Sequence, residues 1–309
     1  MSEVATLGEA MTLFLAEPGR PLGDAALFER SVAGAEANVA IGLARLGHQV
    51  SFIGRVGSDV FGDGVRRMLR GEGVEISGLL IDTDRPTGLL VRDVPVGRPV
   101  TVVYHRTGSA GAGLRSEDID PEVVSSAKIL HITGITAALS TSARAAVEYA
   151  VGIAVEAGVP ISFDPNVRLQ LASLDYWSDL VATLAPHADT VLVGADELRM
   201  LGRDVASFLN DGASTVVVKD GARGAWVTDG TETHQVPARS VTEVDPVGAG
   251  DAFAAGWLSG TLRNLPIGDR LREAAVVASC VVAARGDVSG LPDSATRDRL
   301  NQGHVDVLR

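Results

Sequence analysis

A glycine-rich segment near the carboxyl end of the chain carries the residues best suited to chemistry. Gly248, Ala249 and Gly250 are small, and Asp251 follows them at the start of an apolar run that favours a helix. Backbone amides of small residues can approach a ligand closely, and the amides that begin a helix bind anions. The segment therefore predicts an anion hole with a carboxylate at its edge, which suits phosphoryl transfer to a hydroxyl. The alternative is a glycine-rich turn before a core helix, with Asp251 as a first-turn acid.

Several other polar residues follow strand-like or turn-rich segments. Arg106 comes after a predicted hairpin, and Arg168 comes after a predicted strand, so the two could clamp an anionic group. Asn38 lies near the start of a predicted helix and could bind a polyol. The alternatives are surface arginines in an arginine-rich chain and a solvated asparagine. Lys219 is one of only two lysines, and it ends a β-rich run at a tight turn.

These residues must be positioned by elements that alternate between strand and helix. The expected strands are 50–54, 129–132, 160–163, 190–193, 215–218, 225–228 and 233–236, and the expected helices are 37–46, 142–156, 176–184, 251–262 and 267–285. Such alternation predicts an α/β fold with a largely parallel sheet and helices on both faces. Ligands in such sheets bind beyond the carboxyl ends of the strands.

Two segments break the alternation. Residues 11–32 and 87–105 are rich in β-forming and turn-forming residues and lack a helical apolar stripe. Within the second segment, 88–91 and 100–104 flank a turn at Pro95–Pro99, which predicts a hairpin. We therefore expect a small β lid made of both segments. The remaining residues, 1–10, 33–86 and 106–309, then form the α/β domain that binds nucleotide and substrate.

Composition excludes several classes of protein. The net charge of −12 argues against nucleic acid as a partner. No apolar run is long enough to cross a membrane, and no signal-like segment begins the chain, so we expect a cytoplasmic protein without membrane partners. A single cysteine, Cys280, fits a reducing compartment. The chain has no G-x-x-x-x-G-K-[ST] motif, which argues against a Walker-type nucleotide fold.

Taken together, three segments resemble the ribokinase-like (PfkB) family of carbohydrate kinases. Residues 245–253 are similar to the carboxyl-terminal signature of the family, 33–62 to its amino-terminal signature and 219–224 to its nucleotide-loop motif. The resemblance covers nearly the whole chain. It implies a ribokinase-like three-layer sandwich with a mostly parallel central sheet and a small β-sheet lid.

Within the family, the chain is similar to 2-keto-3-deoxygluconate kinases. The similarity lies in Gly8-Glu9, in Tyr104-x-Arg106 with 108–110, and in Asn166-x-Arg168. Fructokinases share much of this pattern. One departure is Gly194, where the family often has an asparagine linked to magnesium.

The resemblance implies a role for each matching residue. Asp251 would be the base, with Gly248, Ala249 and Gly250 as the anion hole. Substrate would be held by Gly8, Glu9, Gly34, Ala35, Asn38, Tyr104, Arg106, Asn166 and Arg168. Nucleotide would lie along Lys219, Gly221, Gly224, Gly250 and Ser279. Glu197 would bind Mg²⁺ through water, and Asp245, Val247, Gly286 and Ser289 would form a monovalent-cation loop.

The resulting expectation is an enzyme that uses ATP and Mg²⁺, with K⁺ at the monovalent-cation loop, to phosphorylate a small sugar or sugar acid. A 2-keto-3-deoxygluconate kinase fits best. A fructokinase or ribokinase is the alternative within the family, and a non-catalytic sugar sensor is the alternative outside enzymes. The resemblance also implies a homodimer formed through the β lid.

Overall fold

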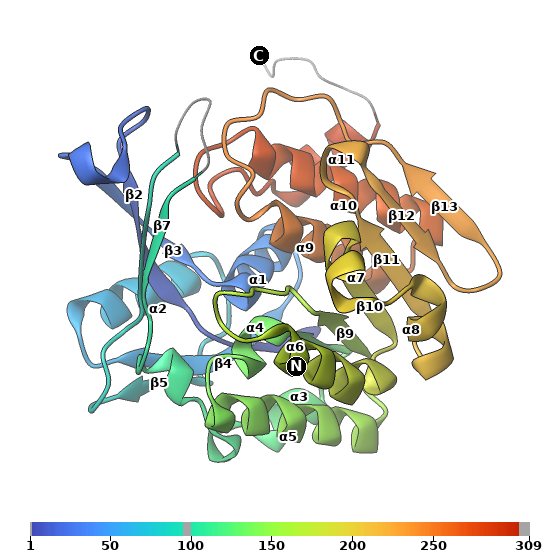
Figure 1. The fold of residues 1–309 in the computed structure, drawn as a ribbon, viewed down its shortest axis with the longest axis horizontal. Helices are drawn as coiled ribbons and strands as arrows, with labels where there is room; N and C mark the ends of the chain where they lie inside the picture. Colours follow the sequence, from blue (N-terminus) through green and yellow to red (C-terminus); the bar gives the residue numbers. More distant parts are fainter. Residues whose placement is uncertain (1, 95–99, 303–309) are drawn as a thin grey trace.

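The computed structural model describes residues 2–94 and 100–302, which form two β-sheets and the helices around them (Figure 1). The larger sheet has nine strands in the order β13-β12-β11-β10-β9-β8-β1-β4-β5. Its strands are β1 Val4–Leu7, β4 Val50–Gly57, β5 Leu79–Asp82, β8 Ile129–Thr133, β9 Ile161–Asp164, β10 Thr190–Gly194, β11 Thr215–Lys219, β12 Ala225–Thr228 and β13 Thr233–Val236. Only β12 and β13 run antiparallel to their neighbours, so the predicted, mostly parallel sheet is confirmed.

Helices cover both faces of this sheet. They are α1 Ala35–Arg45, α2 Val60–Gly71, α3 Pro121–Ser125, α4 Gly134–Ala137, α5 Thr141–Ala157, α6 Leu174–Leu184, α7 Ala195–Leu201, α8 Val205–Asp211, α9 Ala249–Leu262, α10 Ile267–Val282 and α11 Ser294–Asn301. Successive strand residues point to opposite faces. Val217 therefore belongs to the apolar core on the side of α1, α9 and α10, whereas its neighbour Val218 belongs to the core on the side of α5, α6 and α8. The result is the predicted three-layer sandwich.

The smaller sheet, here called the lid sheet, has the order β3-β2-β6-β7. Its strands are β2 Met11–Ala16, β3 Phe28–Ala33, β6 Leu89–Arg92 and β7 Val102–His105. β6 and β7 pair antiparallel, which confirms the predicted hairpin, but its turn at Pro95–Pro99 lies outside the described residues. The two predicted lid segments meet because β2 pairs parallel with β6.

Some element boundaries differ from the predicted ones. Helix α1 begins at Ala35 rather than at residue 37, because Gly34 already caps it. Helix α10 ends at Val282 rather than near residue 285, because the chain turns there into a loop in which Gly286 has a positive φ of 91°. This loop brings Asp287 to the carboxyl ends of the parallel strands, where the polar site residues lie.

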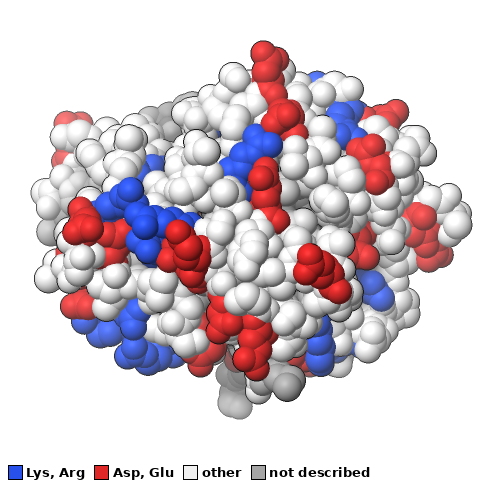
Figure 2. Space-filling model, turned by 90° about the horizontal axis from the view of Figure 1, so that it is seen from below, with Lys and Arg blue, Asp and Glu red and all other residues white. Residues whose placement is uncertain are grey.

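Figure 2 shows how charged side chains are distributed over one face of the molecule. Acidic and basic side chains alternate over this face, and no continuous basic field covers it. Among the described residues, no helix is both long and apolar enough to cross a membrane.

Candidate active site

A cleft of about 510 Å³ lies between the lid sheet and the carboxyl ends of the parallel strands. It brings together most of the predicted site residues: Glu9, Gly34, Ala35, Asn38, Tyr104, Arg106, Asn166, Arg168, Glu197, Lys219, Gly221, Val247, Gly248, Gly250 and Asp251. These residues come from the segment before β2, the end of β7, the starts of α1 and α9, and the segments that follow β9, β10 and β11. The cleft therefore lies where parallel sheets generally bind ligands.

The start of α9 forms one wall of the cleft. Gly248 caps this helix with a φ of 85°, and a side chain there would also collide with the carbonyl oxygen of Asp287, 2.7 Å away. The amide of Ala249 already donates to the carbonyl of Pro246 at 3.3 Å. Gly250 and Asp251 lie in the first helical turn, where amides have no carbonyl partner within the helix. An anion at this wall would therefore meet the amides that follow Ala249 and the positive end of the helix dipole.

Asp251 lies beside these amides and is held by one side chain. Asn38, in the first turn of α1, donates from Nδ2 to Oδ2 of Asp251 at 2.8 Å. Burial raises the pKa of Asp251 to about 7, the nearby Asp164 and Asp287 add to the rise, and the Asn38 hydrogen bond opposes it. A carboxylate with such a pKa can accept a proton near neutral pH.

Lys219 crosses the cleft floor toward the same helix start. Its Nζ lies 2.5 Å from Oδ2 of Asp164. The same Nζ would lie 3.9 Å from a Cβ atom placed on Gly250. Burial lowers the pKa of Lys219, but the carboxylates of Asp164, Glu197 and Asp251 outweigh it and leave the pKa above its ordinary value. The lysine therefore presents a permanent positive charge beside the anion-binding amides.

Glu197 is buried beside this lysine and has a structural task. Its Oε1 accepts from the amide of Val167 at 2.7 Å, and its Oε2 accepts from the amide of Gly194 at 2.6 Å. Burial raises its pKa, although Lys219 opposes the rise. Each carboxylate oxygen keeps one lone pair with which it can accept a further hydrogen bond. No cluster of three or more metal-ligating side chains occurs among residues 2–94 and 100–302.

The two arginines predicted to hold an anion differ in their contacts. Arg106 Nη2 lies 2.6 Å from Oε2 of Glu9, and the guanidinium also stacks over the ring of Tyr104. The other oxygen of Glu9 accepts from Ser109 at 2.6 Å. Arg168 is 47% exposed in its side chain, and its Nη1 donates to the carbonyl of Val167 at 2.9 Å and lies 4.0 Å from Oε1 of Glu197. Arg168 is therefore the more exposed of the two arginines and the one with the weaker carboxylate partner.

Gly8 is not among the residues that line the cleft. Its lack of a side chain leaves space for the buried carboxyl group of Glu36. A side chain on Gly8 would collide with Glu36, which accepts hydrogen bonds from Thr133 and Thr136, each at 2.6 Å. Burial raises the pKa of Glu36 to about 7, against these two donors. The carboxyl of Glu36 thus supports the wall at the start of α1.

Five further predicted residues lie away from the cleft lining among the described residues. Ser279 donates within its own helix to Val276 at 2.7 Å, so the structure does not bring its hydroxyl to the cleft. Gly224 has a φ of 100° and packs against the backbone near residue 237. Asp245 and Gly286 are joined by a hydrogen bond of 2.9 Å from the Gly286 amide, and Ser289 follows in the same loop.

Three charged residues of this region were missed from the sequence. Asp164 pairs with Lys219, and Arg92 and Asp287 pair with each other at 2.7 Å. Asp164 had a detectable signal, because it ends a β-rich run directly before Pro165-Asn166. Arg92 had a weaker one, since strand alternation places it on the same inward face as the buried Leu90.

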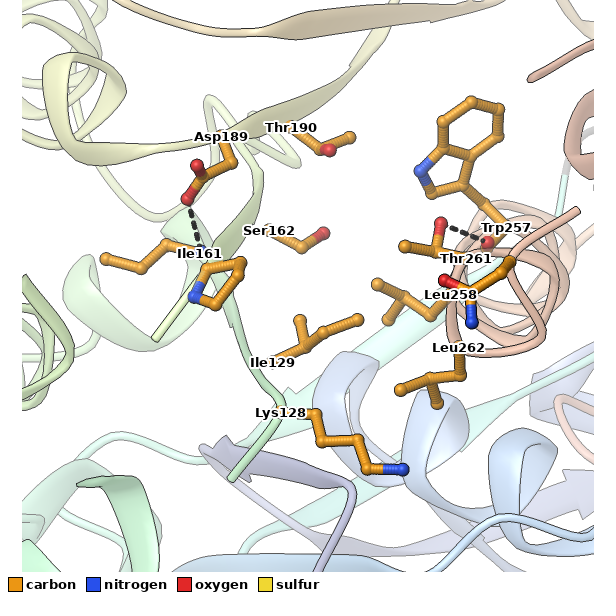
Figure 3. Close-up of a pocket in the computed structure, with 12 residues that line it drawn as sticks. Lys128, Ile129, Ile161, Ser162, Asp189, Thr190, Trp257, Leu258, Thr261 and Leu262 are labelled. Atoms are coloured by element: carbon orange, nitrogen blue, oxygen red, sulfur yellow. Dashed lines mark hydrogen bonds between the residues drawn. The ribbon is translucent and has the colours of Figure 1, made fainter. Parts of the chain in front are cut away.

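A second hollow, of about 260 Å³, lies at the opposite edge of the sheet, where β8, β9 and β10 begin (Figure 3). Its polar side chains serve local structure: Asp189 accepts from the Ile161 amide at 2.8 Å, and Thr261 donates to the Trp257 carbonyl at 2.9 Å. Asp189 and Thr261 are therefore engaged within this hollow.

A partly buried carboxylate, a lysine and the start of a helix converge at the carboxyl edge of a parallel sheet, and this arrangement is typical of enzymes that transfer phosphoryl groups to small molecules. Comparison with known proteins supports the same class. Residues 1–294 match the pfkB family of carbohydrate kinases, so the chain belongs to this family and is a phosphotransferase.

Individual relatives agree over nearly the full length. The chain is 36% identical to a 2-dehydro-3-deoxygluconokinase of Bacillus subtilis, over 96% of this chain and 94% of the relative. It is also 36% identical to a 2-dehydro-3-deoxygluconokinase of Thermoproteus tenax, over 97% and 94%. A putative ribokinase II from E. coli, solved in complex with ATP and Mg²⁺, superimposes with a TM-score of 0.91 at 28% identity, over 98% of this chain and 100% of that one.

Proposed function

We propose that this carbohydrate kinase transfers the γ-phosphoryl group of ATP to a hydroxyl of 2-keto-3-deoxygluconate (2-dehydro-3-deoxygluconate), with Mg²⁺ present. The observation that carries the proposal is the position of Asp251, beside the start of α9 and in the same cleft as Arg168. The first feature suits phosphoryl transfer, and the second suits an acidic sugar. The relatives from B. subtilis and T. tenax support the choice of substrate.

The chemical step follows from the contacts of Asp251. The carboxylate takes the proton of the substrate hydroxyl as that oxygen attacks the γ-phosphorus. Asn38 keeps the carboxylate oriented by its 2.8 Å hydrogen bond, and burial sets a pKa suited to this exchange. The amides of Gly250 and Asp251 then stabilise the charge on the transferring group, as preorganised dipoles do in phosphoryl transfer.

ATP and Mg²⁺ fit the residues on the nucleotide side of the cleft. If Gly250 carried a Cβ atom, the nearest atom to it would be Nζ of Lys219, at 3.9 Å. Phosphate oxygens can therefore approach both Gly250 and Lys219. Mg²⁺ would neutralise phosphate charge, and it takes most of its ligands from phosphates and water. Glu197, through water, is the carboxylate we assign to it, and Gly221, which lines the cleft, is the residue of the 221–224 turn that we assign to the nucleotide.

The sugar-acid assignment rests on Arg168 more than on Arg106. Glu9 already neutralises Arg106 at 2.6 Å, whereas Arg168 is half-exposed and more weakly paired. A substrate carboxylate gains charge-assisted hydrogen bonds from such a guanidinium, and a neutral hexose does not. Tyr104, Gly34, Ala35, Asn38 and Asn166 complete the substrate side.

A coupled assay of ADP formation across a panel of sugars tests the proposal. We expect 2-keto-3-deoxygluconate to be phosphorylated with a higher kcat/KM than fructose or ribose. A preference for fructose or ribose would instead indicate a fructokinase or ribokinase. Binding without any turnover across the panel would indicate a sugar sensor.

We further propose that residues 11–32 and 87–105 act as a lid and as the contact surface of a homodimer. Both edge strands of the lid sheet expose apolar side chains, with Phe28 of β3 42% exposed and Val103 of β7 40% exposed. Exposed apolar side chains of this size are typical of protein contact sites. Location in the cytoplasm stays a prediction from the sequence.

A further inference from the structure

The lid sheet carries an arginine that is fully buried against the body of the molecule. Arg92 ends β6 and is 0% exposed. Its Nη2 lies 2.8 Å from Oδ2 of Asp245 and 2.7 Å from Oδ1 of Asp287. A guanidinium stays charged at every physiological pH, and burying it is costly unless carboxylates face it. Arg92 therefore places a permanent positive charge between Asp245 and Asp287.

Asp245 belongs to the loop that resembles the monovalent-cation loop of the family, together with Val247, Gly286 and Ser289. Here both of its carboxylate oxygens are already engaged. Oδ1 accepts from the amide of Val247 at 3.2 Å, and Oδ2 accepts from the amide of Gly286 at 2.9 Å while also facing Arg92. Two backbone amides and a guanidinium therefore already face the Asp245 carboxylate, which is the group that would have to bind K⁺. The residues present do not fit a K⁺ held through Asp245.

We propose that Arg92 supplies from the lid sheet the positive charge that loops of this kind take from a monovalent cation, so that turnover does not depend on K⁺. Arg92 is a positioning residue, because it acts through two carboxylates. Asp245 lies three residues before Gly248, so its position sets the approach to the anion-binding amides. Asp287 faces Asn38 at 3.5 Å, and Asn38 orients Asp251.

The first test needs no variant. Turnover with MgATP and the preferred sugar is measured in buffers whose only monovalent cation is K⁺, Na⁺ or tetramethylammonium. We expect the three rates to agree within about twofold, a negligible difference in barrier. Activation of the wild type by K⁺ of about tenfold or more would overturn the proposal.

The second test removes the arginine. Arg92→Ala leaves two buried carboxylates without their cation, so turnover in tetramethylammonium should fall by at least about tenfold. K⁺ or guanidinium added to this variant should restore part of the rate, whereas Arg92→Lys should stay independent of the salt. An equal loss in every salt, with no rescue, would show that Arg92 is only a structural contact.

Thermal unfolding without substrate gives a readout that does not depend on the proposed function. K⁺ should raise the Tm of Arg92→Ala relative to tetramethylammonium, and it should leave the wild type unchanged. Arg285→Ala is the matched control, because Arg285 also ties the lid sheet to the body, through Glu29, but has no contact with Asp245 or Asp287 among its described partners. The same K⁺ response in Arg285→Ala, or a K⁺-specific stabilisation of the wild type, would contradict the proposal. A failed sugar assay alone would count only against the proposed substrate.

Discussion

Asn38 and Asp251 lie 213 residues apart in the chain and are joined by a 2.8 Å hydrogen bond from Nδ2 to Oδ2. The bond connects the first turns of α1 and α9, two helices that pack side by side. Because Asn38 donates to the carboxylate form, it fixes the orientation of the base and opposes the rise in pKa that burial causes. The first two predictions depend on this pair.

Asp251→Asn should abolish most turnover and leave ATP binding within a few-fold. A general base contributes about 10²–10⁴ in rate, and the amide keeps the shape of the side chain. Single-turnover kinetics and a nucleotide-binding titration measure the two effects. Asp196→Asn removes a carboxylate from the same cleft and serves as the control, with a far smaller loss. Near wild-type kcat in Asp251→Asn would end the assignment of the base.

The pH dependence should show the raised pKa of Asp251 directly. Only the ionised carboxylate accepts a proton, so kcat/KM should fall by about tenfold per pH unit below the pKa of about 7 and level off above it. Asn38→Ala removes a donor that lowers this pKa, so the acidic limb should move to higher pH. Profiles from about pH 5 to about pH 9 for both proteins check the sign. A limb that moves to lower pH in the variant would refute the role of Asn38.

Arg168→Ala should lower kcat/KM for 2-keto-3-deoxygluconate by about 10- to 150-fold, which corresponds to one hydrogen bond to a charged group. The loss should be much smaller for fructose, because a neutral sugar gains little from the guanidinium. Arg199→Ala, an exposed arginine of α7, is the control. Equal losses for both sugars would mean that Arg168 does not contact the acid group.

Magnesium should be required although Gly194 stands where the family often has asparagine. Excess chelator should abolish turnover, and added Mg²⁺ should restore it, because phosphates and water supply most magnesium ligands. Glu197→Gln should raise the magnesium concentration needed for half-maximal rate, and Gly194→Asn should lower it. Full activity in chelator would contradict the mechanism.

Val103→Asp should weaken association between subunits. Val103 is 40% exposed on β7, an edge strand of the lid sheet, and a buried carboxylate in an interface is costly. Sedimentation across a concentration series should give a dimer for the wild type and a smaller species for the variant. A wild type that stays monomeric would remove the proposed interface.

The sequence alone predicted the residues whose role depends on local structure. Gly248 to Asp251 could be assigned because a glycine-rich turn and the start of a helix lie within a few residues. Seven of the nine strands of the larger sheet were also predicted as short β-rich runs, whereas β1 and β5 were not. Arg92 and Asp287 were missed because their pairing spans 195 residues and depends on how the lid sheet packs on the body. The parallel pairing of β2 with β6 is non-local for the same reason.

Glu9 has a mechanical consequence beyond its contact with Arg106. The chain passes between the two sheets four times, near residues 8–10, 34, 87–88 and 106–111, and every passage touches Glu9 or contains it. Side chains on Gly34 or Gly111 would collide with Glu9, one on Gly88 would come within 2.8 Å of its carboxylate, and Arg106 is bonded to it. The crossings near Glu9 therefore form one anchor between the lid sheet and the larger sheet. The pairs of Arg92 with Asp245 and Asp287, at the other end of β6, form a second anchor.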